Sequence, residues 1–256
     1  MTFKYVSVDE AIRRGGLRMV VVGGVPSPWG EAAKGILHIK GIEWVAVRLV
    51  YDSEALKNWA GQRSGPVAIY EQEKPRSGWA EILELAERIA PTPSVLPADA
   101  AARAVVMELG RDLFGEGGLA WARRLQMIHA GLNNAGGFPG RVAGYLAKKY
   151  GYSPEVGATA GTRVAEVLEK LVVRLKDQKK AGSRYYVGNS VTALDVYAAT
   201  AMAMFRALPP AQCDMDAGMR AAFETRDART DAALDPVLFE HRDMMYAKHL
   251  ELPLSL

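Results

Sequence analysis

The sequence predicts a two-domain protein, in which a small α/β domain is followed by an all-helical domain. Short β-branched runs alternate with helical spacing up to about residue 90. The segment Pro91–Pro97 then carries three prolines in seven residues, so neither a helix nor a strand can continue through it. Every periodic segment beyond it has helical spacing. We therefore expect an N-terminal extension at 1–16, an α/β domain at 17–90, a linker at 91–97 and a helical domain at 98–256.

The first predicted domain starts at Leu17–Val22, which reads LRMVVV and stops at two glycines. Such a β-branched run without polar alternation is typical of a buried strand. A helix from about Trp29 to Lys40 follows, with Gly41 as its left-handed end. The remaining expected elements are strands at 44–50 and 67–70, a short helix at 53–60, a weak edge strand at 73–76 and an amphipathic helix after Gly78. This order predicts a small α/β layer with a mixed sheet.

The second predicted domain contains amphipathic helices and one helix that is apolar on nearly all sides. Two apolar stripes have helical spacing, one formed by Trp121, Leu125, Ile128 and Leu132 and the other by Val164, Val167, Leu168, Leu171, Val172 and Leu175. Residues 131–141 between them lack periodicity and are expected to form a loop. Gly188–Phe205 is apolar all round, which predicts a buried central helix. Thr192 and Asp195 at its start predict a capping box, in which each side chain bonds the other's backbone N–H.

Composition argues against several function classes. The net charge of +3 is small and dispersed, and basic pairs such as Arg123–Arg124 read as solvated helix ends, so no nucleic-acid partner is expected. The longest apolar runs fall short of the ~20 residues that a bilayer span needs, and no apolar signal segment opens the chain, so we expect a cytoplasmic protein without a membrane partner. The single cysteine, Cys213, fits a reducing compartment.

Motifs for other chemistries are missing. The four histidines show no spacing typical of metal ligands, so no metal is expected. The turn GGVPSPWG lacks the GxGxxG spacing of a dinucleotide site, and no GxSxG nucleophile elbow is present.

Three local patterns, in this order, give the chain a resemblance to a known family. They are SPWGEAAKGILHIKGI (Ser27–Ile42), GPVAIY followed eleven residues after Pro66 by SGWAEIL, and GNSVTALD before the apolar helix. Together with the proline-rich linker, they resemble the glutathione S-transferase superfamily from about Leu17 to Phe205. The resemblance implies a thioredoxin-like N-terminal domain, an all-helical bundle as C-terminal domain and, as is common in the family, a homodimer.

The resemblance also assigns roles to residues near the first turn. It implies a cis peptide bond between Gly65 and Pro66, with the Gly65 backbone pairing with the cysteinyl backbone of glutathione. Ser27 takes the position of the catalytic serine, whose hydroxyl, together with the positive helix end, would stabilise the thiolate. A serine followed by proline is equally an ordinary helix cap, so both interpretations of Ser27 stand. Trp29 is a candidate for the wall of the acceptor pocket, as are Trp121 and Met127, with plain core packing as the alternative for all three.

The end that would hold the glutamyl part of glutathione departs from the family pattern. Where family members carry an acid followed by serine, this chain has Ser77–Gly78, and the neighbouring Arg76 has the opposite charge. The helix that starts there would keep backbone N–H groups for the glutamyl carboxylate, and Ser77 would add a hydroxyl. The acid that would meet the glutamyl ammonium is absent, which removes about 1.5–3 kcal/mol of binding free energy.

The leading functional prediction is a serine-type glutathione transferase of the detoxification kind. Glutathione would be the co-substrate and an apolar electrophile the acceptor, in a conjugation or a thiol-dependent cleavage. The change at Ser77–Gly78 motivates the alternative, a non-catalytic ligand-binding or protein-interaction module with the same fold and a degenerate glutathione site.

Overall fold

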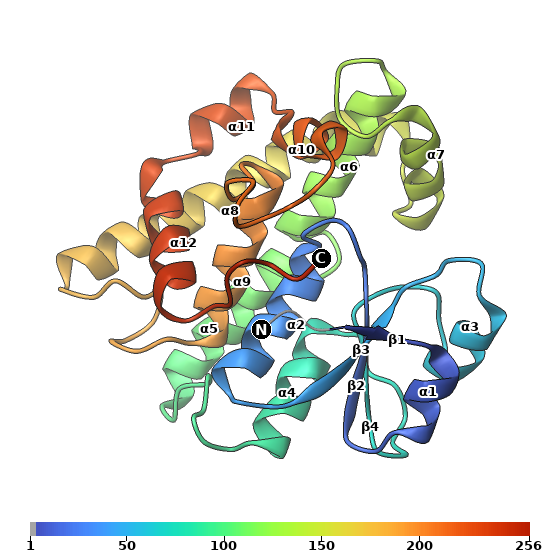
Figure 1. The fold of residues 1–256 in the computed structure, drawn as a ribbon. Helices are drawn as coiled ribbons and strands as arrows, with labels where there is room; N and C mark the ends of the chain where they lie inside the picture. Colours follow the sequence, from blue (N-terminus) through green and yellow to red (C-terminus); the bar gives the residue numbers. More distant parts are fainter. Residues whose placement is uncertain (1–3) are drawn as a thin grey trace.

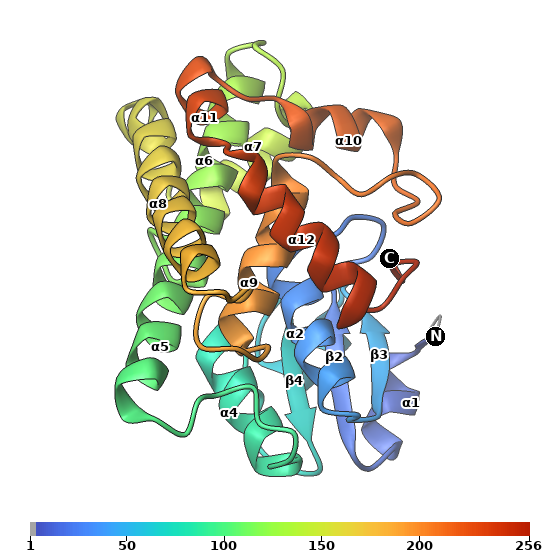
Figure 2. The same ribbon diagram turned by 90° about the vertical axis from the view of Figure 1, so that its left-hand side faces the viewer.

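The computed structural model describes residues 4–256. The first domain contains the strands β1 (Tyr5–Val6), β2 (Leu17–Val21), β3 (Trp44–Arg48) and β4 (Val67–Tyr70), and the helices α1 (Val8–Arg13), α2 (Pro28–Ile39), α3 (Glu54–Ala60) and α4 (Trp79–Ile89). The second domain contains α5 (Ala100–Phe114), α6 (Leu119–Leu132), α7 (Gly140–Lys149), α8 (Pro154–Lys180), α9 (Ala193–Ala201), the 3₁₀ turn η1 (Met202–Met204), α10 (Ala217–Glu224), α11 (Ala228–Ala233) and α12 (Pro236–Lys248). Figures 1 and 2 show the sheet at one end of the molecule and the helical domain packed against it.

The sheet is mixed, as the sequence predicted. Its order is β1-β3-β2-β4, with β1, β3 and β2 parallel and β4 antiparallel to β2. All residues of β2 are buried because helices cover both faces of the sheet. Leu17, Met19 and Val21 pack into the large core with α2 and α4, whereas Val20 packs with α1 and α3 on the other face. The unbroken apolar run of β2 is therefore explained by burial on two sides.

The strands expected at 17–22, 44–50 and 67–70 correspond to β2, β3 and β4, and Gly41 has the expected left-handed conformation, with a φ of 63°. The edge strand expected at 73–76 is reduced to one antiparallel bridge between Ala68 and Arg76. Pro75 has no N–H group to extend this ladder, which explains the short pairing.

The segment expected to be an N-terminal extension at 1–16 contains two elements of the first domain. Tyr5 of β1 pairs with Ala46 of β3, and the fully buried Ala11 of α1 packs against Leu56 of α3. This placement corrects the expectation that the sheet begins at Leu17; residues 1–3 lie outside the described part. A strand of two residues and a helix of six are too short to give a recognisable period.

Helix α9 is the centre of the helical domain, and every one of its residues is buried, as its all-round apolar sequence predicted. It packs against α2 of the first domain as well as against α5 and α12. Gly35 permits the close approach of α2, because a Cβ atom there would lie 2.9 Å from Val196 Cγ1 and 2.8 Å from Leu250 Cδ2. The two domains therefore share one continuous hydrophobic core.

The basic pair Arg123–Arg124 is not solvated, contrary to the sequence-based prediction. It lies inside α6, with Arg123 fully buried and Arg124 only 7% exposed. Arg123 is held by backbone carbonyls, since its Nε donates to Met204 O at 3.0 Å and its Nη2 to Phe223 O at 2.7 Å. Tertiary contacts with the 3₁₀ turn and α10 bury the pair, and the sequence gives no local sign of them.

Residues 4–256 contain neither a membrane-spanning helix nor a metal-binding cluster. None of the helices there combines the length and the apolar character needed to cross a membrane. No group of three or more His, Cys, Asp or Glu side chains in that range is arranged to hold a metal ion.

Candidate functional site

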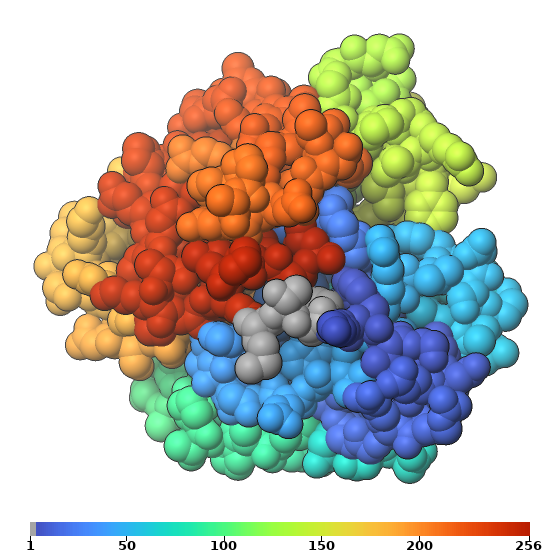
Figure 3. All heavy atoms as spheres, in the orientation of Figure 1, coloured from blue at the N-terminus to red at the C-terminus, as the bar shows by residue number. Residues whose placement is uncertain are grey.

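A cavity of about 360 Å³ lies between the two domains. The first domain contributes the segment after β2, the start of α2, the turn after β3 and the residue before Pro66, and the second contributes α6, α7, α10 and the loop between α6 and α7. The lining residues are Val22, Val25, Ser27, Trp29, Tyr51 and Gly65 from the first domain, and Arg124, Phe138, Arg141, Val142, Tyr145, Leu146, Lys149, Tyr150 and Met219 from the second. In Figure 3 the yellow-green surface of α7 meets the blue and light-blue surface of the first domain on the right-hand side. A cavity of this size suits a small organic ligand.

Ser27 occupies the N-cap position of α2, and Pro28 sets the first helical residue. Its backbone is used by the turn, because Ser27 N–H donates to Val25 O and Ser27 O accepts from the N–H of Glu31, both at 2.8 Å. Its side chain makes no capping hydrogen bond, although the residue is only 6% exposed. The hydroxyl is therefore available to a ligand in the cavity, close to the positive end of the helix.

Gly65 lines the same cavity as Ser27, and the Gly65–Pro66 peptide bond is cis, as the resemblance implied. Among the described residues, neither its N–H nor its C=O makes a hydrogen bond to protein. A Cβ atom at this position would lie 3.2 Å from Val20 O, so the small residue lets this segment pack closely on the end of β2. Free backbone groups at the wall of a cavity can pair with an extended peptide-like ligand.

Trp29 also lines the cavity and joins the two domains. Its Nε1 donates to Phe114 O at 3.0 Å, and its ring lies 5.8 Å from the Phe114 ring and 6.4 Å from the Tyr150 ring. Trp121 and Met127 do not reach the cavity. Trp121 packs edge-on against Tyr150 at 4.7 Å, and Met127 is fully buried in the core, which fits the packing alternative for both.

Ser77 and Gly78 lie at the start of α4 and do not line this cavity. Their backbone N–H groups donate to Oε2 of Glu81, at 3.3 Å from Ser77 and 3.0 Å from Gly78. These two hydrogen bonds lower the pKa of the Glu81 carboxyl. The N–H groups expected to receive a glutamyl carboxylate are thus occupied by a carboxylate of the chain itself.

Three basic residues, Arg124, Arg141 and Lys149, face this cavity from the second domain, and sequence reasoning missed all three. Burial lowers the pKa of the Arg124 guanidinium, and burial together with the repulsion from Arg124 lowers the pKa of the Lys149 ammonium. A sequence signal did exist in α7, where Arg141, Tyr145 and Lys149 recur every four residues and so share one face. No local sequence pattern indicated that Arg124 would line a cavity.

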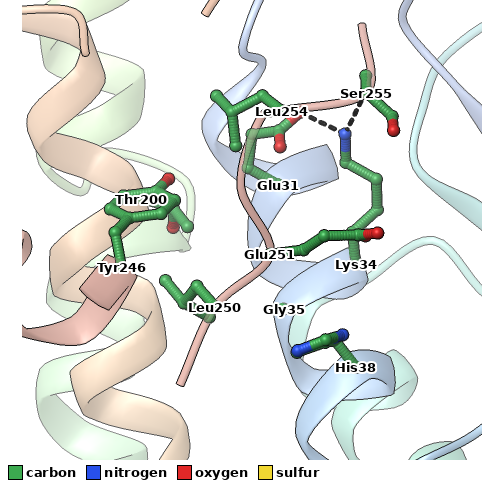
Figure 4. A pocket seen from close by; sticks show the side chains of 10 residues that line it. All are labelled: Glu31, Lys34, Gly35, His38, Thr200, Tyr246, Leu250, Glu251, Leu254 and Ser255. Atoms are coloured by element: carbon green, nitrogen blue, oxygen red, sulfur yellow. Dashed lines mark hydrogen bonds and ion pairs between the residues drawn. The ribbon is translucent and has the colours of Figure 1, made fainter. Parts of the chain in front are cut away.

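A second cavity, of about 20 Å³, lies where the C-terminal segment crosses α2 (Figure 4). Lys34 Nζ donates to Ser255 O at 2.7 Å and pairs with Glu31 Oε1 at 2.6 Å, while burial raises the pKa of the Glu31 carboxyl. The buried hydroxyls of Tyr246 and Ser255 have no partner among the described residues. A polar space of this size accommodates a single water molecule, so this cavity is a structural feature.

The fold belongs to the glutathione-transferase-like class. It has a thioredoxin-like sheet domain, an all-helical domain, and between them a cavity with a serine whose side chain makes no capping hydrogen bond. At the level of sequence the chain matches no protein-family model, and no curated protein is similar enough to count as a relative. Solved structures are similar in fold. A glutathione S-transferase from Methylobacterium radiotolerans in complex with glutathione sulfonate is 18% identical, with 91% of each chain covered and a TM-score of 0.63.

Two further structures are similar over nearly the whole chain. A glutathione transferase family member from Pseudomonas fluorescens with two glutathione molecules bound is 12% identical, with 94% of each chain covered and a TM-score of 0.62. A beta-etherase from a Sphingobium species is 15% identical, covers 90% of this chain and 99% of its own, and has a TM-score of 0.57. The chain therefore has the glutathione S-transferase fold.

Proposed function

We propose that this protein is a serine-type glutathione transferase, in which the thiol of glutathione attacks an electrophile in the cavity between the domains. The observation that carries the proposal is the placement of Ser27. Its hydroxyl makes no capping hydrogen bond and lies at the positive end of α2. It shares a cavity with the backbone N–H and C=O of Gly65, which have no hydrogen-bond partner among the described residues. The fold neighbours crystallised with glutathione or glutathione sulfonate support this choice of thiol.

The chemistry assigned to Ser27 is a hydrogen bond to sulfur. A free thiol has a pKa of about 8.5, so it is mainly protonated at neutral pH. One charge-assisted hydrogen bond of about 1.5–3 kcal/mol lowers that pKa by one to two units and makes a large share of the thiol nucleophilic. In a conjugation the new C–S bond forms as the leaving group departs with its bonding electrons, and the thiol proton passes to solvent.

A second candidate function is a non-catalytic binding module with the same fold. The observation that favours it is Glu81, whose carboxylate takes the N–H groups of Ser77 and Gly78. Glutathione would have to displace this carboxylate or bind without that contact. In both candidate functions we propose a cytoplasmic homodimer. Light scattering on the purified protein gives its molar mass and so tests the dimer.

Retention on immobilised glutathione, together with turnover of 1-chloro-2,4-dinitrobenzene, separates the two candidates. The transferase is expected to be retained and to convert the electrophile faster than the uncatalysed reaction. Absence of both signals at high glutathione concentration would exclude the transferase and leave the binding module.

Restoring the acid–serine pair of the family tests the departure at the glutamyl end. We expect the double variant Ser77→Glu/Gly78→Ser to bind glutathione about tenfold more tightly, since it regains a carboxylate for the ammonium and a hydroxyl at the helix start. A Cβ atom at Gly78 would lie 3.1 Å from Glu81 Oε2, so the flexible Glu81 side chain must also move away from the N–H groups. Isothermal titration calorimetry gives the affinities.

The matched control is Ser77→Gln/Gly78→Ala, which adds similar bulk without the charge or the hydroxyl. It is expected to leave the affinity unchanged. An equal gain in both double variants would show that the displacement of Glu81, and not the restored pair, improves binding.

A further inference from the structure

The second-domain wall of the cavity carries an uncompensated positive charge. Arg124, Arg141 and Lys149 line it, and the lining residues include no aspartate or glutamate. Among the described residues none of the three forms an ion pair within 4.0 Å. Elsewhere basic side chains do find acids; on α8, for example, Arg163 and Lys170 both bind Asp112 at 2.9 Å.

Arg124 is the most constrained of the three cations. It is 7% exposed, and its guanidinium carbon lies 5.4 Å from the Phe138 ring centroid and 5.1 Å from that of Phe223. The two rings hold the guanidinium by cation–π contact without neutralising it. Its one polar side-chain neighbour among the described residues is the neutral hydroxyl of Tyr150, and it lines the cavity.

Burying a cation without an anion is costly, because the lost hydration is not replaced. Such an arrangement is commonly found at sites where a bound anion supplies the missing charge. The remaining wall is aromatic, with Tyr51 and Tyr145 5.2 Å apart from opposite domains and Trp29 beside them. The cavity thus combines flat aromatic surface with guanidinium groups, which bind carboxylates in a bidentate manner.

We propose that the acceptor half of this cavity binds an aromatic electrophile that carries a carboxylate, with Arg124, Arg141 and Lys149 holding the carboxylate. This inference rests on the proposed transferase function and names the class of its second substrate. The acceptor is therefore anionic rather than simply apolar. The cations belong to the helical domain, whereas Ser27 and Gly65, which face the thiol and its backbone, belong to the first domain.

A matched pair of electrophiles tests the proposal. The acid 4-chloro-3,5-dinitrobenzoate and its neutral carboxamide react by the same step, in which the sulfur bonds to the ring carbon and chloride leaves with the bonding electrons. The ratio of kcat/KM for acid over amide is measured in the wild type, Arg141→Gln and Lys149→Gln. Both substitutions lie on the exposed side of α7 and leave the core intact.

We expect each of these two variants to lower the acid-to-amide ratio about tenfold, the equivalent of one charge-assisted hydrogen bond. The intrinsic reactivities of the two electrophiles cancel in the comparison between variants. Lys148→Gln is the matched control, because it makes the same change at the neighbouring exposed position, which does not line the cavity. Its ratio is expected to equal that of the wild type.

An unchanged ratio in Arg141→Gln and Lys149→Gln would overturn the inference while leaving the transferase function intact. An unchanged ratio with a raised KM for glutathione would assign the cations to the carboxylates of glutathione, which also overturns it. If the wild type turns over neither electrophile, the proposed function fails, and the binding of unreactive 3,5-dinitrobenzoate and 3,5-dinitrobenzamide is compared by tryptophan fluorescence. Preference for the benzoate, lost in the two α7 variants, supports the anion site, and equal binding refutes it.

Discussion

Replacing Ser27 by alanine is expected to lower kcat/KM for glutathione conjugation about 100-fold while leaving the fold nearly as stable as before. The activity falls because the hydroxyl that stabilises the thiolate is lost, a difference of about 2–3 kcal/mol in the transition state. The stability is kept because the Ser27 side chain makes no capping hydrogen bond in α2. Steady-state kinetics and urea denaturation measure the two quantities.

Ser53→Ala provides the opposite control. Ser53 is the N-cap of α3, its Oγ accepts from the N–H of Leu56 at 3.1 Å, and it does not line the cavity. This variant is expected to lose about 1 kcal/mol of unfolding free energy and to keep its activity.

A spectroscopic measurement completes the test of Ser27. The ultraviolet absorbance of the thiolate follows the pKa of bound glutathione, which we expect to rise by one to two units in Ser27→Ala. If Ser27→Ala loses stability like Ser53→Ala and keeps its activity, Ser27 is only a helix cap.

Replacing Asp195 by alanine is expected to destabilise the protein by about 4 kcal/mol or more. Asp195 is fully buried at the start of α9, and its carboxylate has four hydrogen-bond partners. They are the backbone N–H of Tyr186 at 2.9 Å, the N–H and the hydroxyl of Thr192 at 2.8 and 2.7 Å, and His241 Nε2 at 3.0 Å. Alanine leaves these groups buried without an acceptor, which costs more than the bonds themselves contribute.

The matched control is Asp216→Ala, since the side chain of the N-cap Asp216 accepts one hydrogen bond among the described residues, from the N–H of Met219 at 2.9 Å. That substitution should cost about 1 kcal/mol. Urea denaturation of both variants gives the comparison, and Asp195→Asn, which keeps the shape but places a donor among donors, should lie between them. Equal losses for Asp195→Ala and Asp216→Ala would mean that Asp195 acts as an ordinary cap.

The contacts of Asp195 show which interactions can be predicted from the sequence and which cannot. The spacing of Thr192 and Asp195 predicted a capping box, and Asp195 Oδ2 does accept from the Thr192 N–H, whereas the Thr192 hydroxyl donates to the same carboxylate and caps no backbone N–H. The contacts with Tyr186 and with His241 of α12 were not predictable, because they depend on how distant segments pack around α9. A similar limit applies to Ser77–Gly78, where the sequence showed the missing acid but not that Glu81 would occupy the freed N–H groups.

The resemblance to a known family implied the cis bond at Gly65–Pro66. By itself the sequence determined the strands β2, β3 and β4 in their order, the proline-rich break between α4 and α5 and the apolar character of α9. These features depend on residues a few positions apart, so their spacing along the chain is sufficient to predict them. Only the tertiary structure decided that β1 and α1 complete the first domain and that Arg124 is buried beside a cavity. The charge of that cavity arises where α6 and α7 meet the segment after β2, and the hydration that Arg124 loses there depends on neighbours distant in sequence.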